Sequence, residues 1–67
     1  MGDEEIYIKL EEDVQYALNS GNLNLAYEAY GAVKMARLIG AITSEQFFEL
    51  NDRVVKNGII YLSTNRY

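Results

Sequence analysis

The side chains best suited to chemistry in this sequence are its carboxylates, because the chain contains neither histidine nor cysteine. Glu11, Glu12 and Asp13 are consecutive, and consecutive residues of a helix point about 100° apart. These three carboxylates therefore do not converge on one ligand. We interpret them as an acidic face exposed to solvent.

A second acidic group, Glu45, Glu49 and Asp52, shares one face of a predicted helix, where two carboxylates could hold a hard cation. Glu49 and Asp52, however, each precede a base by four residues, and these bases are Arg53 and Lys56. This spacing favours ion pairs along the helix. We therefore expect ion pairs here, with no metal site and no cofactor.

Nucleophilic catalysis is not expected either. A serine nucleophile needs an adjacent base to activate it, and no histidine is present to activate Ser20, Ser44 or Ser63. Glycine-rich loops that bind phosphate are also missing, since Gly21 and Gly40 each stand alone. The sequence therefore predicts a protein that is not an enzyme.

Aromatic and basic residues share one face of a predicted central helix. They are Tyr27, Tyr30, Lys34 and Arg37. Tyrosine and arginine are enriched at the hot spots of protein interfaces. We predict that this stripe binds a partner, which is another protein or a second copy of the chain. The alternative is that both tyrosines pack in the core.

Four bases on two predicted helices offer an alternative function, that of a nucleic-acid-binding regulator. They are Lys34, Arg37, Arg53 and Lys56. The charge distribution opposes this function, because residues 1–30 carry seven acids and one lysine, or −6, and residues 31–67 carry five bases and three acids, or +2. Binding to nucleic acid depends mainly on neutralising phosphates. We therefore do not expect nucleic acid as the ligand.

The leading hypothesis is a small non-enzymatic module for protein–protein interaction. Its net charge of −4 suggests one specific form, by analogy with small acidic proteins of phages and mobile elements. In that form it is an inhibitor or adaptor that acts on a basic or nucleic-acid-handling partner protein. No motif in the chain identifies the partner.

The elements that position these residues are predicted to be helices. The chain has no proline, and Gly21, Gly40 and Gly58 divide it into pieces of helical length. Apolar residues recur three or four positions apart within each piece. We predict one all-α domain over residues 1–67, built on an antiparallel helical hairpin and followed by an apolar tail. The predicted helices cover about 4–19, 23–39 and 44–57.

The corner between the second and third helices carries the most specific local signals. Gly40 is the expected C-terminal cap of the second helix. Thr43 and Gln46 have the spacing of a capping box, and Ile42 and Phe47 have the spacing of a hydrophobic staple. All these signals predict a helix that begins directly after Thr43.

Several assignments depend on packing. In the second helix, the residues expected to be buried are Leu25, Ala29, Ala32, Val33, Ala36 and Ile39. Asn51 is expected to hydrogen-bond the backbone of the corner. Residues 5–10 also alternate between apolar and polar types, so a short strand is an alternative there. Residues 59–62 are left open between helix, strand and tail.

The same corner resembles a DNA-binding helix-turn-helix at Ala36 and Gly40. That motif also buries the residues six and nine positions after the glycine, and these are Gln46 and Glu49, both polar. The apolar register is shifted by one residue, about 100° around the helix. The resemblance is therefore superficial, and the pattern predicts a plain antiparallel hairpin.

The sequence also predicts where the protein resides. No apolar run approaches the roughly 18 residues of a membrane span. The N-terminal segment Met-Gly-Asp-Glu-Glu is acidic, the opposite sign to that of a secretory or mitochondrial leader. We expect a cytoplasmic protein without a membrane partner.

Overall fold

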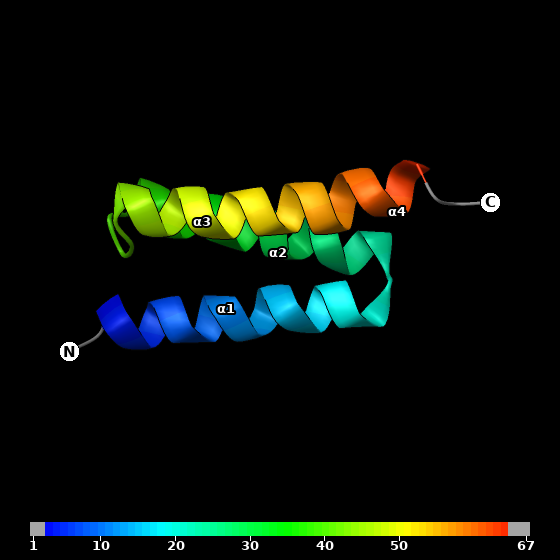
Figure 1. Ribbon diagram of the computed structural model, residues 1–67. Helices are drawn as coiled ribbons and strands as arrows, with labels where there is room; N and C mark the ends of the chain where they lie inside the picture. Colours follow the sequence, from blue (N-terminus) through cyan, green and yellow to red (C-terminus); the bar gives the residue numbers. More distant parts are fainter. Residues whose placement is uncertain (1–2, 65–67) are drawn as a thin grey trace.

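The computed structural model, which describes residues 3–64, is helical almost throughout (Figure 1). Helix α1 spans Asp3–Ser20, α2 spans Leu23–Leu38 and α3 spans Ser44–Val54. A π-helical segment, η1 (Val55–Ile60), continues α3 into the short helix α4 (Tyr61–Thr64). No strand occurs within these residues, which confirms the all-α prediction and shows that the strand alternative for residues 5–10 was wrong.

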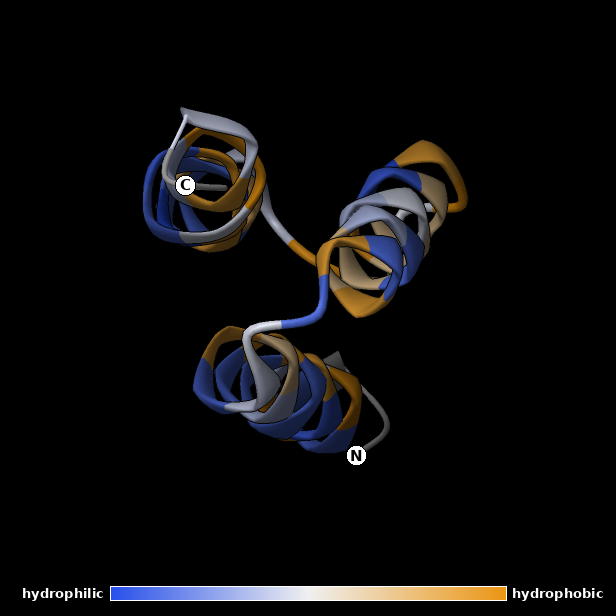
Figure 2. Ribbon diagram, turned by 90° about the vertical axis from the view of Figure 1, so that its right-hand side faces the viewer, coloured by the Kyte–Doolittle hydropathy of each residue, from blue (hydrophilic) through white to orange (hydrophobic). Residues whose placement is uncertain are grey.

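The three long helices form an antiparallel bundle that measures 43 × 17 × 14 Å. In Figure 1, α3, η1 and α4 form one continuous rod beside α2, and α1 lies below them. Figure 2 views the bundle from its end, with the three helices in three separate positions around a common centre. Each helix therefore contacts the other two and leaves one side open to solvent.

Tight turns join the helices. Gly21 and Gly40 have φ angles of +67° and +77°, which glycine adopts without a steric cost. The Asn22 side chain caps α2 by accepting hydrogen bonds from the backbone N–H groups of Asn24 and Leu25. None of the helices described has the length and apolar composition needed to cross a lipid bilayer.

The predicted corner is confirmed in detail. The Thr43 Oγ1 accepts a hydrogen bond of 3.1 Å from the Gln46 backbone N–H, and the Gln46 Oε1 accepts one of 2.9 Å from the Thr43 backbone N–H. Ile42 is buried, and Phe47 packs against the core. These contacts determine where α3 begins and how it turns back along α2.

The core is made mostly of small and branched side chains. Its buried members come from all three helices and the corner: Leu10, Val14, Ala17, Ala26, Ala29, Val33, Ala36, Ala41, Ile42, Leu50 and Val54. The predicted stripe of α2 was wrong at Ala32 and Ile39, which are exposed. Because α2 packs against both α1 and α3, its buried arc is centred between them and includes Ala26 instead.

The predicted end of the third helix at residue 57 was also wrong. Gly58 is buried inside η1, and a Cβ atom placed there would lie 3.0 Å from Leu18 Cδ2 and 3.4 Å from Ala26 Cβ. This glycine therefore permits a close approach between helices instead of ending one. The segment expected to be a tail is helical, and Ile59 and Leu62 pack against the core.

Asn51 does not make the hydrogen bond predicted for it. It lies half-buried on α3, two turns beyond the corner. Its side chain makes no hydrogen bond to another residue of the described part of the chain. The rise of about 1.5 Å per residue along α3 places Asn51 too far from the corner to reach it.

Candidate functional site

The four residues of the predicted partner-binding stripe occupy two different environments. Tyr27 is exposed, whereas Tyr30 packs against the core. The Lys34 Nζ lies 5.3 Å from the centroid of the Tyr30 ring, a cation–π contact. The Arg37 Nη2 donates a 2.8 Å hydrogen bond to the Ser44 Oγ. The stripe therefore extends from the core to the surface along the α2–α3 side of the bundle.

The basic side chains differ in whether a carboxylate neutralises them. The described bases are Lys9, Lys34, Arg37, Arg53 and Lys56. Three of them form ion pairs with nearby acids. Lys34 and Arg37 instead contact the Tyr30 ring and the Ser44 hydroxyl, and no carboxylate within residues 3–64 pairs with either. Both bases therefore keep positive charge available at the surface.

An open, shallow pocket lies beside these two bases. Lys34, Arg37, Leu38 and Phe47 line it, and its volume is about 460 Å³. Leu38 is 79% exposed although it is an aliphatic side chain. The Phe47 ring contacts the Phe48 ring at 5.7 Å between centroids. We name these five residues the corner surface.

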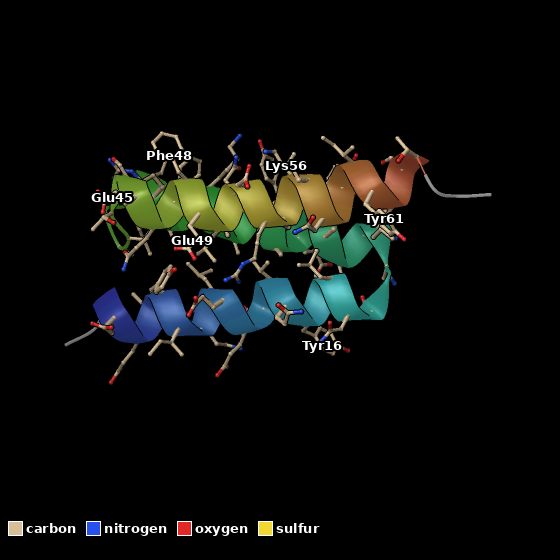
Figure 3. All side chains as sticks on the ribbon, in the orientation of Figure 1. Tyr16, Glu45, Phe48, Glu49, Lys56 and Tyr61 are labelled. Carbon is tan, nitrogen blue, oxygen red and sulfur yellow. The ribbon has the colours of Figure 1, made fainter. Side chains whose placement is uncertain are left out.

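Phe48 extends the apolar part of the corner surface away from α1. It is 66% exposed, and Figure 3 shows its side chain on the outer side of α3, whereas Glu49 lies on the side that faces α1. Met35 and Ile39, near the end of α2, are also exposed. Large apolar side chains are thus concentrated around the turn between α2 and α3.

A second groove lies between α1 and α2, with a volume of about 360 Å³. Its lining comes from both helices: Asp13, Tyr16, Ala17, Leu25, Glu28, Ala29 and Ala32. One of its two carboxylates, that of Asp13, is already paired with Lys9. We regard this groove as a weaker candidate, because it lacks a cation and most of its apolar lining is small.

The three carboxylates of the predicted acidic face have different surroundings. The Glu11 Oε2 lies 3.8 Å from the Arg53 Nη2 on α3. The Asp13 Oδ1 lies 3.1 Å from the Lys9 Nζ. Glu12 is exposed to solvent. As the consecutive positions predicted, the three carboxylates point in different directions.

The four bases of the alternative nucleic-acid patch fall into two groups. Arg53 lies between Glu11 and Glu49, and Lys56 pairs with Asp52. Lys34 lies at the level of Phe47, which lines the same pocket. Lys56 lies nine residues after Phe47 on the rod formed by α3, η1 and α4, which is about 13 Å along its axis. The structure therefore brings Lys34 and Arg37 together but not all four bases.

A polar seam between α1 and α3 was not predicted. The Tyr7 Oη donates a 2.9 Å hydrogen bond to the Glu49 Oε1. The Glu49 Oε2 lies 3.7 Å from the Arg53 Nη2, which also faces Glu11. Of these contacts, only the Glu49–Arg53 pair had a signal in the sequence, through its spacing of four residues.

The seam changes the acidity of its tyrosine. Burial of the hydroxyl, followed by its hydrogen bond to Glu49 and the charge of Glu11, raises the pKa of Tyr7 to about 12. A negative tyrosinate beside two carboxylates is unfavourable, so the neutral phenol is retained. The seam therefore holds α1 against α3 most strongly while Tyr7 is protonated.

Within residues 3–64, no group of three or more acidic side chains is arranged to hold a metal ion. No family model matches the sequence, and neither the curated proteins nor the solved structures give a significant match.

Proposed function

We propose that this protein is a non-enzymatic interaction module that binds a partner protein through the corner surface. The observation that carries the proposal is the arrangement around Leu38, the most exposed of the large apolar side chains described. It lines the same pocket as Lys34 and Arg37, which have no carboxylate partner among the described residues. Protein interfaces combine an apolar centre, enriched in aromatic residues and arginine, with a polar rim.

Energetics support this use of the surface. Burying apolar area contributes about 25 cal/mol per Å², and Leu38 and Phe48 keep most of their area in water, being 79% and 66% exposed. Contiguous exposed apolar patches are uncommon on monomers and mark interaction sites. A partner would gain affinity from the apolar side chains and specificity from the two bases.

The charge of the corner surface modifies the hypothesis from the sequence. The acidic inhibitor or adaptor was expected to act on a basic protein, with Glu11, Glu12 and Asp13 as its acidic face. Two of those acids are paired within the chain. The corner surface offers positive charge instead, which favours an acidic segment on the partner.

Affinity capture from the native host tests the proposal. The variant Leu38→Gln/Phe48→Gln replaces the two exposed apolar side chains with a good helix former. The matched control, Tyr16→Gln/Ile60→Gln, changes two exposed apolar residues away from the corner. We expect the wild type and the control to retain the same partner, and the corner variant to lose it by about tenfold or more. Equal retention by the corner variant would contradict the proposal.

A further inference from the structure

We infer that the partner segment bound at the corner surface is an amphipathic helix with acidic side chains beside its apolar face. This inference rests on the proposed function and names the chemistry of the partner. Its three supports are the row of residues along α2, the charge of the pocket and the open space above Gly31.

The row runs along the open side of α2. Tyr27, Gly31, Lys34 and Leu38 have spacings of four, three and four residues, which place them in line on a helix. The row is about 16 Å long. Tyr27 and Leu38 are both exposed at its ends. An exposed row of this length and straightness fits an amphipathic helix, which contacts a surface through residues three and four apart, and its Lys34–Leu38 end lines the pocket.

The centre of the row permits close approach. Gly31 has no Cβ atom, and nothing lies within 4 Å of the position that a Cβ would occupy. Helices pack with their axes about 8–10 Å apart, and small residues at the contact favour the shorter distances. A partner helix at this position would lie against α2 and beside α3, as a fourth helix of the bundle.

The charge of the pocket selects among amphipathic helices. Lys34 and Arg37 line the pocket together with Leu38 and Phe47. A carboxylate on the incoming helix would find two bases whose present contacts are neutral, a tyrosine ring and a serine hydroxyl. The protein as a whole has a net charge of −4, so long-range attraction alone would favour a basic helix. The local and the global charges therefore predict opposite preferences.

Synthetic helices separate these two predictions. The probes are two helix-stabilised peptides of roughly 14 residues, or four turns. They share one leucine face and differ only in having glutamates or lysines beside it. Binding is followed through the amide NMR signals of the isotope-labelled full chain. We expect the glutamate peptide to bind about tenfold more tightly or better, with the largest shifts within 27–38 and 47–48.

Charge reversal supplies the matched test. In Lys34→Glu/Arg37→Glu we expect the preference to invert, so that the lysine peptide binds more tightly. The control Lys9→Glu/Lys56→Glu makes the same change in net charge at two exposed bases away from the corner surface, and should keep the preference of the wild type. The circular dichroism spectrum at 222 nm verifies that each variant is folded.

The outcomes distinguish this inference from the proposed function. Tighter binding of the lysine peptide to the wild type, or shifts confined to α1, would overturn the inference. Shifts at the corner surface that depend on protein concentration alone would assign that surface to a second copy of the chain, and would overturn it too. If neither peptide binds, the inference is wrong. If Leu38→Gln/Phe48→Gln nevertheless loses the captured partner, the proposed function stands, with a partner of another chemistry.

Discussion

The Tyr7 hydroxyl on α1 donates a hydrogen bond of 2.9 Å to the Glu49 carboxylate on α3, joining residues that are 42 positions apart in the chain. Glu49 also faces Arg53, which in turn faces Glu11 on α1. This seam uses Arg53 for contacts within the bundle. The described carboxylates of the seam therefore pair with Arg53, whereas none within residues 3–64 pairs with Lys34 or Arg37.

The seam makes stability depend on pH in the alkaline range. The pKa of Tyr7 is raised from 10.0 to about 12 by burial, by the hydrogen bond to Glu49 and by the charge of Glu11. Between these values the unfolded chain loses the proton that the folded chain keeps, so stability falls as pH rises. The contribution is complete below pH 10 and is lost as pH rises through about 12.

Tyr7→Phe should remove this contribution. At neutral pH we expect a loss of about 1 kcal/mol in the free energy of unfolding, because one hydrogen bond is lost. Between pH 10 and 12 the difference between wild type and variant should shrink. Urea unfolding followed by circular dichroism measures both effects. Tyr27→Phe, at an exposed tyrosine, is the control. A constant difference across this pH range would contradict the account of the seam.

Gly58→Ala tests the close approach at η1. The added Cβ would lie 3.0 Å from Leu18 Cδ2 and 3.4 Å from Ala26 Cβ, so Leu18 must move. Overpacking costs about 1–3 kcal/mol, against a gain of up to about 1 kcal/mol from the helix propensity of alanine. We expect a net loss of about 1 kcal/mol in the free energy of unfolding, measured by urea denaturation.

Gly31→Ala is the matched control for this change. Gly31 lies within α2, with nothing within 4 Å of its Cβ position. We expect Gly31→Ala to raise the free energy of unfolding by about 1 kcal/mol, since only helix propensity changes. If both alanine variants gained equally, Gly58 would not be required by packing.

The capping box provides the clearest local prediction. Thr43→Ala removes the acceptor for the Gln46 backbone N–H and should cost about 1 kcal/mol of stability. Thr43→Ser keeps a hydroxyl at the same place and should restore most of the loss. Thermal unfolding of the three proteins checks this. Equal stability of the alanine and serine variants would mean that the cap does not stabilise α3.

The ion pairs within the bundle should contribute unequally to the free energy of unfolding. Arg53 is one-third exposed and lies between two carboxylates on different helices, whereas Lys56 is largely exposed and pairs along its own rod. We expect Arg53→Gln to cost up to about 1 kcal/mol at low salt, and Lys56→Gln to cost less. Raising the salt to about 1 M should reduce the first effect, because the charges are screened. The opposite ranking in urea unfolding would contradict this.

The corner was predictable because its signals are local. The capping box joins Thr43 to Gln46, three positions apart, and the left-handed Gly40 depends only on its own backbone. Such contacts form between residues that are already neighbours in the sequence. A sequence pattern alone therefore identifies them.

Gly58 shows where local reasoning fails. A glycine that ends a helix and a glycine that permits helices to approach have the same sequence signal. The side chains that a Cβ at Gly58 would meet most closely, Leu18 and Ala26, lie 40 and 32 positions earlier in the chain. Only the packed structure brings these three residues together.

Only part of the candidate site could be predicted from the sequence, because some of its residues come together only when the helices pack. Lys34 and Arg37 were predicted from their spacing on one helix. The contribution of Leu38 and Phe47 depends on how α2 packs against α3. The exclusion of Arg53 from the basic patch depends on Glu11, which lies on another helix.

Photo-cross-linking in the native host tests the central claim most directly. A photoreactive phenylalanine analogue is placed at Phe48 or Leu38 on the corner surface, and at Tyr16 or Ile60 as exposed control positions. We predict that one partner protein is cross-linked from Phe48 and Leu38, and that neither control position yields it. Adducts of that partner from Tyr16 or Ile60, with none from the corner surface, would contradict the account.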